Sequence, residues 1–201
     1  MLHTETVAGP TLELLKKLEA EAAMVDFNLA GGTSLALYLG HRISVDLDLF
    51  TPKPFDAKKM ETFLRDKYGF RSDFMEKNTL KGTIDGVKID CITHSYDYLE
   101  KPYTESGIRL YSMEDIIAMK LSAIADIAFL STRFPFGSML RLYERKFPGS
   151  NVIRPFKAIT YFDDIDFEED IVMLNCKFDW KLIERRLVDM TKIQNKVFDS
   201  F

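Results

Sequence analysis

Apolar positions recur at two different periods along this chain, and the change of period divides it near residue 112. Before that point helical spacing predicts helices over 11–24, 33–39 and 56–69. Alternating runs in the same part predict strands over 27–30, 44–50, 70–94 and 107–111. After it only helical patterns occur, over 113–130, 135–147, 151–162 and 180–198. The pattern predicts two domains. Residues 1–112 form an α+β domain that begins with a helix, and residues 113–201 form a helical C-terminal domain.

Two aspartates interrupt the apolar strand predicted at 44–50. Val45, Leu47 and Leu49 alternate with Asp46 and Asp48, so the two carboxylates point to the same side. Strands disfavour aspartate, and like charges this close cost stability unless a cation lies between them. The pair is therefore a candidate site for magnesium or manganese. The alternative is a solvated edge strand.

A third aspartate in a second strand favours the metal site. Asp85-Gly86 between two alternating runs predicts a hairpin, whose second strand at 87–92 carries Asp90 between apolar neighbours. Three aspartates on two neighbouring strands are what a two-metal phosphoryl-transfer site needs. Taken alone, Asp90 is also typical of a carboxylate near the end of a hairpin.

The turn Gly31-Gly32-Thr33, just before the predicted helix 33–39, supplies a complementary feature. Residues without Cβ allow backbone N–H groups to approach a phosphate, and the helix start adds the positive end of its dipole. A lone Gly-Gly is often only a tight turn. Because the turn and Asp48 fall within eighteen residues, the combination favours a phosphate site beside a metal site.

Composition narrows the class of protein. A net charge of −4 argues against wholesale coating of nucleic acid. Cys91 and Cys176 form no CxxC pattern, which indicates buried thiols of a cytoplasmic protein. The N-terminus lacks the pattern of a signal peptide, and no apolar run approaches the ~20 residues needed to span a bilayer. We expect a soluble cytoplasmic protein with no membrane partner, in which His41 and His94 only hydrogen-bond locally.

One segment, 131–160, is locally basic, with a net charge of +5. Its charged side chains are Arg133, Arg141, Glu144, Arg145, Lys146, Arg154 and Lys157. They can hold an RNA phosphate backbone, with Phe134, Phe136 and Tyr143 available for stacking. The alternative is a solvated helix face balanced by the acidic segment 161–170, which we expect to be an exposed loop.

The stretch LAGGTSLALYLGHRISVDLDLF resembles the signature of the AbiEii/AbiGii toxin-type nucleotidyltransferases, which belong to the DNA polymerase β-like nucleotidyltransferase superfamily. The resemblance continues at VKIDCI, SMEDIIAMKLSAIA and MLRLYERKFP, and covers roughly residues 25–160. It implies a nucleotidyltransferase-like mixed β-sheet with flanking helices. It also implies magnesium- or manganese-dependent transfer of a nucleoside monophosphate from an NTP to an acceptor hydroxyl on RNA, tRNA or protein.

The resemblance also implies roles for individual residues. Asp46 and Asp48 would bind metal, and Asp90 would bind the catalytic metal and help to deprotonate the acceptor hydroxyl. The residues it implies for nucleotide binding are Gly31, Gly32, Thr33, Arg42, Ser44 and Lys120. Of these, Arg42 and Ser44 are equally consistent with a surface arginine and a loop serine.

The chain departs from the family after Lys120, where members usually carry a pattern like KKDFxDL. Here Ala125 is followed directly by Asp126-Ile127, without the basic pair and the first aspartate. Asp126 matches the final aspartate. This departure supports a second hypothesis, a catalytically silent nucleotide- or partner-binding module. The resemblance further implies the toxin of a toxin–antitoxin, or abortive infection, pair, whose partner would be a cognate antitoxin.

Overall fold

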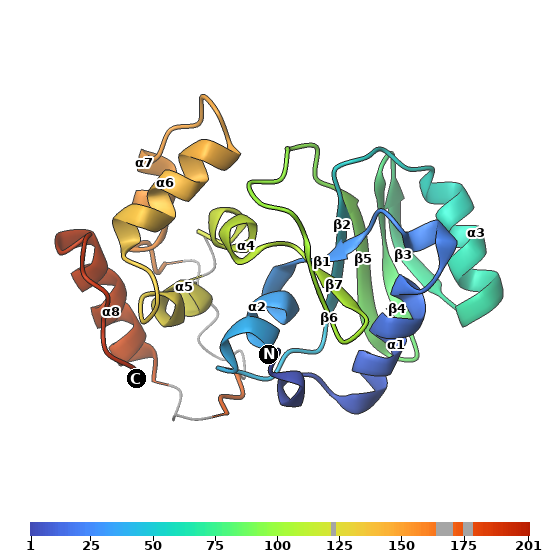
Figure 1. The fold of residues 1–201 in the computed structure, drawn as a ribbon, viewed down its shortest axis with the longest axis horizontal. Helices are drawn as coiled ribbons and strands as arrows, with labels where there is room; N and C mark the ends of the chain where they lie inside the picture. Colours follow the sequence, from blue (N-terminus) through green and yellow to red (C-terminus); the bar gives the residue numbers. More distant parts are fainter. Residues whose placement is uncertain (122–123, 164–170, 175–178) are drawn as a thin grey trace.

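The computed structural model describes residues 1–121, 124–163, 171–174 and 179–201. In these residues one mixed sheet is flanked by helices (Figure 1). The strands are β1 Asn28–Leu29, β2 Leu47–Thr51, β3 Arg71–Glu76, β4 Thr79–Ile84, β5 Val87–Thr93, β6 Tyr103–Glu105 and β7 Ile108–Leu110. The α-helices are α1 Gly9–Glu19, α2 Gly31–Leu39, α3 Ala57–Tyr68, α4 Met113–Met119, α5 Ile124–Leu130, α6 Phe136–Lys146, α7 Ile153–Ala158 and α8 Trp180–Lys192. Short 3₁₀ turns lie at Thr4–Thr6 and Ala22–Met24. The predicted α+β fold is confirmed.

The strand order is β3-β4-β5-β2-β1-β7-β6. Strands β2 and β5 are parallel, as are β1 and β7, and the other neighbouring pairs are antiparallel. The predicted hairpin is formed by β4 and β5, where Asp85 and Gly86 both have positive φ (50° and 82°). Such a two-residue turn matches the twist of its strands and fixes their register.

The two faces of the sheet have different partners. Alternate residues of β2, Leu47 and Leu49, are fully buried in a core formed with α1 and α3. The residues between them point to the opposite face. There Asp48 lines a cleft and Phe50 packs against the second core, which contains residues of α4 to α8. In Figure 1, α1 and α3 lie on one side of the sheet and α4 to α8 on the other. The candidate site therefore faces the helical half of the molecule.

The helix predicted at 56–69 is confirmed together with its ends. Asp56 caps α3 by accepting hydrogen bonds from the backbone N–H groups of Lys58 and Lys59 at 3.1 Å. Gly69 ends the helix with φ of 68°, in the left-handed region that favours glycine.

Several predicted elements are wrong in extent. The strand predicted from 44 begins only at Leu47, and Val45 is 59% exposed instead of buried. The leading helix ends at Glu19, and the last two predicted helices span only Ile153–Ala158 and Trp180–Lys192. The periodic pattern of these segments continues into turns, where tertiary contacts decide the backbone conformation. Most of the acidic segment 161–170 lies outside the described residues.

The prediction of one continuous helix over 113–130 is also wrong, because this segment contains two helices. Helix α4 ends at Met119, Lys120 leaves the helical conformation with φ −101° and ψ 8°, and α5 begins at Ile124. Residues 122 and 123 lie outside the described residues. The break changes which side chains can meet.

The boundary predicted near residue 112 crosses one of the two cores. The first core draws all its buried members from residues 2–110. The second combines buried residues of α4, α5, α6 and α8, together with Leu121 and Ile159, with Ala30, Leu35 and Tyr111. Helix α2 therefore contributes to both halves of the molecule. The division into two domains at residue 112 stays a prediction.

A buried ion pair within the helical half holds the segment that follows β5. Lys146, near the end of α6, and Asp115, in α4, are both fully buried, with Nζ and Oδ1 2.7 Å apart. The ammonium also donates to the carbonyl of Asp97 at 2.7 Å. Asp115 accepts further hydrogen bonds from the backbone N–H groups of Leu99 and Glu100. One pair of charges thus ties the segment after β5 to two helices.

The cysteine prediction is confirmed for Cys91, which is buried. Cys176 lies outside the described residues. No described helix is long and apolar enough to cross a membrane.

A buried glutamate at the end of α1 leads to a prediction about pH. Burial raises the pKa of Glu19 to about 7, although the backbone N–H and the charge of Arg109 oppose this. The unfolded chain releases the proton near 4.5, so the stabilisation from this group is present below that pH and lost as pH rises through 7. Relative to Glu19→Gln, the wild-type free energy of unfolding should fall by up to about 3 kcal/mol between pH 5 and 8.

Urea unfolding at several pH values measures this difference. Glu13→Gln is the matched control, because Glu13 is exposed on the same helix, and it should show no such trend. An unchanged difference between wild type and Glu19→Gln across this range would contradict the prediction.

Candidate active site

The candidate site begins with two carboxylates on adjacent parallel strands. Asp48 of β2 and Asp90 of β5 are register partners, so both side chains point to the same face of the sheet. Asp90 is 5% exposed. Burial raises the pKa of Asp48; Lys120 opposes the rise, while Asp90 and Asp46 add to it. The structure therefore places both Asp46 and Asp90 within electrostatic reach of Asp48.

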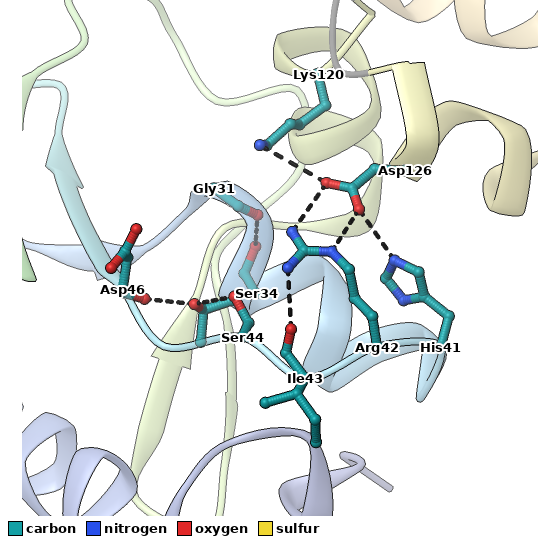
Figure 2. Close-up of polar contacts among 10 residues, drawn as sticks. Gly31, Ser34, His41, Arg42, Ile43, Ser44, Asp46, Lys120 and Asp126 are labelled. Atoms are coloured by element: carbon teal, nitrogen blue, oxygen red, sulfur yellow. Dashed lines mark hydrogen bonds and ion pairs between the residues drawn. The ribbon is translucent and has the colours of Figure 1, made fainter. Parts of the chain in front are cut away.

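Asp46 differs from the other two in its position. It precedes β2 and is exposed, whereas the prediction placed it inside the strand. Its carbonyl accepts a hydrogen bond from the hydroxyl of Thr33. Figure 2 shows this link and its continuation to Ser44, whose hydroxyl oxygen lies 2.8 Å from that of Thr33. Thr33 and Ser44 are both buried, and together they hold the segment that carries Asp46 against the start of α2.

Neighbouring side chains of the site lie so close to Gly31 and Gly32 that neither position has room for a Cβ. A Cβ on Gly31, which has φ of 66°, would lie 1.7 Å from Oδ2 of Asp48. A Cβ on Gly32 would lie 2.3 Å from Nη2 of Arg42. Only glycine lets both charged groups lie against the start of α2. The N-cap residue, Ala30, supplies no side-chain hydrogen bond to the N–H groups there, which suits an anion.

Asp126 lies at the centre of a charged cluster whose other members are His41, Arg42 and Lys120 (Figure 2). Arg42 donates from Nε to Oδ1 at 2.9 Å and from Nη2 to Oδ2 at 3.3 Å. His41 donates from Nε2 to Oδ1 at 3.0 Å. Nζ of Lys120 lies 3.7 Å from Oδ2. Burial alone would raise the pKa of Asp126, but these three neighbours hold it well below its usual range.

The break between α4 and α5 makes this cluster possible. In a continuous helix, residues six apart are separated by about 240° around the axis and about 9 Å along it, so Lys120 and Asp126 could not meet. The interrupted helix brings them together. The expectation that His41 hydrogen-bonds only locally is wrong, because its partner is 85 residues away.

A cleft of about 290 Å³ lies between these groups. The predicted residues that line it are Gly32, Thr33, Arg42, Ser44, Asp46, Asp48 and Lys120. Ile171 and Val172 form another part of the wall. They belong to segment 171–174, which is hydrogen-bonded to the backbone of Ile43 and His41. Asp90 and Gly31 are not among the lining residues, although both adjoin Asp48.

The donor set suits magnesium or manganese. Carboxylate oxygens are the ligands these ions prefer, and Mg²⁺ is usually held by one or two carboxylates together with substrate phosphates. Oδ1 of Asp90 is buried and has no hydrogen-bond partner among the described residues. Within the same residues, no group of three or more His, Cys, Asp or Glu side chains is placed to hold a metal ion. Asp48 and Asp90 therefore fit the ion as a pair, with other ligands supplied by substrate and water.

Sequence reasoning missed Lys81, which ion-pairs with the other oxygen of Asp90 at 2.8 Å. Lys81 and Asp90 are directly opposed in the β4–β5 hairpin. The signal was present, because the two-residue turn at Asp85-Gly86 fixes which residues of the two strands face each other. His41 was missed as a site residue because no local pattern connects it to Asp126.

The locally basic segment 131–160 is only partly a surface. Lys146 is buried in the ion pair with Asp115, and Phe136 is 1% exposed. These two residues are therefore not available to an RNA, which corrects part of the sequence-based hypothesis. Arg154 lines a surface hollow, together with Tyr143.

Comparison with known proteins agrees with this geometry. Residues 13–190 match the model of a family described as "Nucleotidyl transferase AbiEii toxin, Type IV TA system". The chain is 32% identical over 176 residues to the uncharacterized protein aq_aa25 of Aquifex aeolicus (strain VF5), covering 79% of this chain and 85% of that protein. The crystal structure of JHP933 from Helicobacter pylori has a TM-score of 0.50 at 17% identity and covers 92% of each chain, which shows a shared fold.

Proposed function

Because this chain belongs to the AbiEii family of nucleotidyl transferase toxins, we propose that it transfers a nucleoside monophosphate from an NTP to an acceptor hydroxyl on RNA, tRNA or protein. The observation that carries the proposal is the register pair of Asp48 and Asp90 beside the start of α2. Carboxylates that bind metal and a helix start that binds phosphate are the two parts that phosphoryl transfer requires.

The aspartates have distinct roles in the proposal. Asp46 and Asp48 would hold a metal ion on the triphosphate side, and Asp90 with Asp48 would hold one on the acceptor side. When bound, Mg²⁺ or Mn²⁺ supplies the positive charge that stabilises the attacking and leaving oxygens in two-metal catalysis. The acceptor oxygen bonds to the α-phosphorus as the bond to the β-phosphate oxygen breaks, and pyrophosphate leaves. Asp90 helps to take up the hydroxyl proton.

The remaining residues form the phosphate cradle. The N–H groups at Gly31, Gly32 and Thr33 lie at the positive end of α2, where a phosphate would bind. Lys120 and Arg42 add positive charge on the cleft wall. The hydroxyls of Thr33 and Ser44 are hydrogen-bonded to each other, so we assign them to holding the segment of Asp46 in place.

Arg42 is also relevant to the basic pair that family members carry and this chain lacks. Its guanidinium and the Lys120 ammonium both contact Asp126, the residue that matches the final aspartate of the family pattern. Two cations therefore contact this aspartate, although the chain lacks the basic pair that precedes it in the family pattern. This supports an active transferase over the alternative, a catalytically silent nucleotide- or partner-binding module.

An assay with α-labelled NTPs separates the two hypotheses. With magnesium or manganese, the wild-type protein should transfer label to an acceptor in total RNA or protein, and Asp46→Ala and Asp48→Ala should not. Full transfer by either variant would overturn the two-metal assignment. The silent module instead predicts NTP binding by calorimetry with no transfer to any acceptor.

The biological role we propose is the toxic member of a toxin–antitoxin pair with a cognate antitoxin. Expression of the wild-type chain alone should arrest growth, and co-expression of a small neighbouring regulatory gene should restore it. Harmless overexpression without that gene would count against this role, whichever chemistry the protein performs.

A further inference from the structure

A row of three charged side chains crosses the sheet at the candidate site. Lys81 of β4 is the register partner of Asp90 of β5, and Asp90 is in turn the register partner of Asp48 of β2. Directly opposed residues of neighbouring strands point to the same face of a sheet. The face that carries the two carboxylates therefore also carries a lysine, to which the proposed chemistry gives no role.

The two carboxylate oxygens of Asp90 have different surroundings. Oδ2 accepts a hydrogen bond from Nζ of Lys81 at 2.8 Å. Oδ1 is buried and has no hydrogen-bond partner among the described residues. A buried carboxylate oxygen without a partner is costly, so Oδ1 is suited to binding a cation. Because Lys81 holds Oδ2, Oδ1 is the oxygen of Asp90 that is open to a metal ion.

The ammonium of Lys81 is held at this carboxylate. The side chain of Lys81 is 38% exposed, whereas that of Asp90 is only 7% exposed. Ion pairs on the open surface contribute little because water screens them, but a pair with one buried partner is screened less. The positive charge of Lys81 therefore acts on any ion that binds Asp90.

An ammonium and a metal ion on one carboxylate repel each other. In water, two unit charges about 4 Å apart interact strongly enough to change an equilibrium constant roughly fivefold, and a divalent ion doubles the energy. Lys81 therefore opposes the binding of a divalent ion between Asp48 and Asp90. In the metal-free protein the same charge offsets the repulsion between the two carboxylates.

We propose that Lys81 is a resident counter-ion that competes with the metal ion on the acceptor side of the site. In the metal-free protein its ammonium neutralises Asp90, and a divalent ion binds Oδ1 against that charge. The inference rests on the proposed function, because it concerns one of the two metal ions assigned there. Lys81 acts through Asp90, so it is a positioning residue whose effect is on metal affinity.

A purely structural role for Lys81 gives a different expectation. Cross-strand ion pairs stabilise hairpins. Loss of such a pair would leave the affinity for metal unchanged or, by distorting β5, lower it. Competition predicts instead that removal of the lysine raises the affinity. The sign of the change separates the two roles, and misfolding of a variant cannot imitate the expected result.

Titration of the full chain with Mn²⁺ alone, without NTP, measures this affinity through the electron paramagnetic resonance signal of the unbound ion. Lys81→Met should lower the Kd for Mn²⁺ about tenfold, and Lys81→Gln should do the same. Lys81→Arg keeps a positive charge beside Oδ2 and should stay close to the wild-type Kd. Asp90→Asn combined with Lys81→Met should abolish the gain, because the gain arises at Asp90.

Lys88→Met is the matched control. Lys88 is exposed, belongs to the same strand as Asp90, and points to the same face. Its charge also acts on Asp48, so this variant removes the same charge from the same face but keeps the bond between Lys81 and Asp90. It should lower the Kd for Mn²⁺ much less than Lys81→Met.

The outcomes separate this inference from the proposed function. An unchanged or higher Kd for Mn²⁺ in Lys81→Met, or an equal gain in Lys88→Met, would overturn the inference. Label transfer by wild type that requires Asp48 would leave the proposed function intact in that case. Tighter Mn²⁺ binding by Lys81→Met that requires Asp90, without label transfer by wild type to any acceptor, would support the competition and overturn the proposed function.

Discussion

Asp48→Asn will abolish nucleotidyl transfer without destabilising the protein. Asparagine keeps the shape of the side chain beside Gly31 but removes the charge that the metal and its phosphates require. The lost stabilisation of the transition state is several kcal/mol, and each 1.4 kcal/mol is tenfold in rate, so activity should fall by about a thousandfold or more. Burial raises the pKa of Asp48, which means that keeping its charge at neutral pH opposes folding. The variant should therefore be at least as stable as wild type.

Two measurements on the same samples check this prediction. Label transfer from an α-labelled NTP gives the activity, and thermal unfolding without metal gives the stability. Asp73→Asn is the matched control, since Asp73 is exposed on the edge strand β3, and it should change neither. Loss of transfer accompanied by a large fall in Tm would mean that Asp48 acts in folding and not in catalysis.

The positions of Asp48 and Asp90 were the most predictable part of the site. Alternation of apolar and acidic residues places Asp48 on the face opposite Leu49, and a two-residue turn sets the register around Asp90. Both signals are local, so they are present in the sequence alone. What the sequence does not give is that β2 and β5 are adjacent and parallel, because strands separated by a helix and a hairpin can pair in several orders.

The sequence predicted the position of the glycine turn correctly, but it did not show why these two residues must be glycine. From the sequence, Gly31 and Gly32 only indicate a backbone open to phosphate. The structure adds that each glycine makes room for a charged side chain, Asp48 or Arg42, from a later segment. No period or spacing encodes such a contact.

The cluster around Asp126 was the least predictable part. The apolar pattern of 113–130 is helical throughout, and it contains no proline or glycine to mark the break after Met119. The break is associated with contacts from Arg42 and His41, more than eighty residues away. Local propensity cannot report contacts of that range, and here they outweigh it.

The same limit hides the ion pair of Lys146 and Asp115, whose members lie 31 residues apart in the chain. Lys146→Met should lower the free energy of unfolding by about 3–5 kcal/mol, because removing one partner of a buried pair leaves the other charge uncompensated. Asp115→Asn added to Lys146→Met should recover part of the loss, since it removes the uncompensated charge. Urea unfolding at neutral pH measures both variants.

The control for this prediction is Lys157→Met on α7, where the lysine is exposed. It should change the free energy of unfolding by no more than about 0.5 kcal/mol. Equal losses for Lys146→Met and the double variant would show that lost packing, and not the stranded charge, causes the effect. The ion pair ties α4, α6 and the segment after β5 together, so its loss should loosen all three.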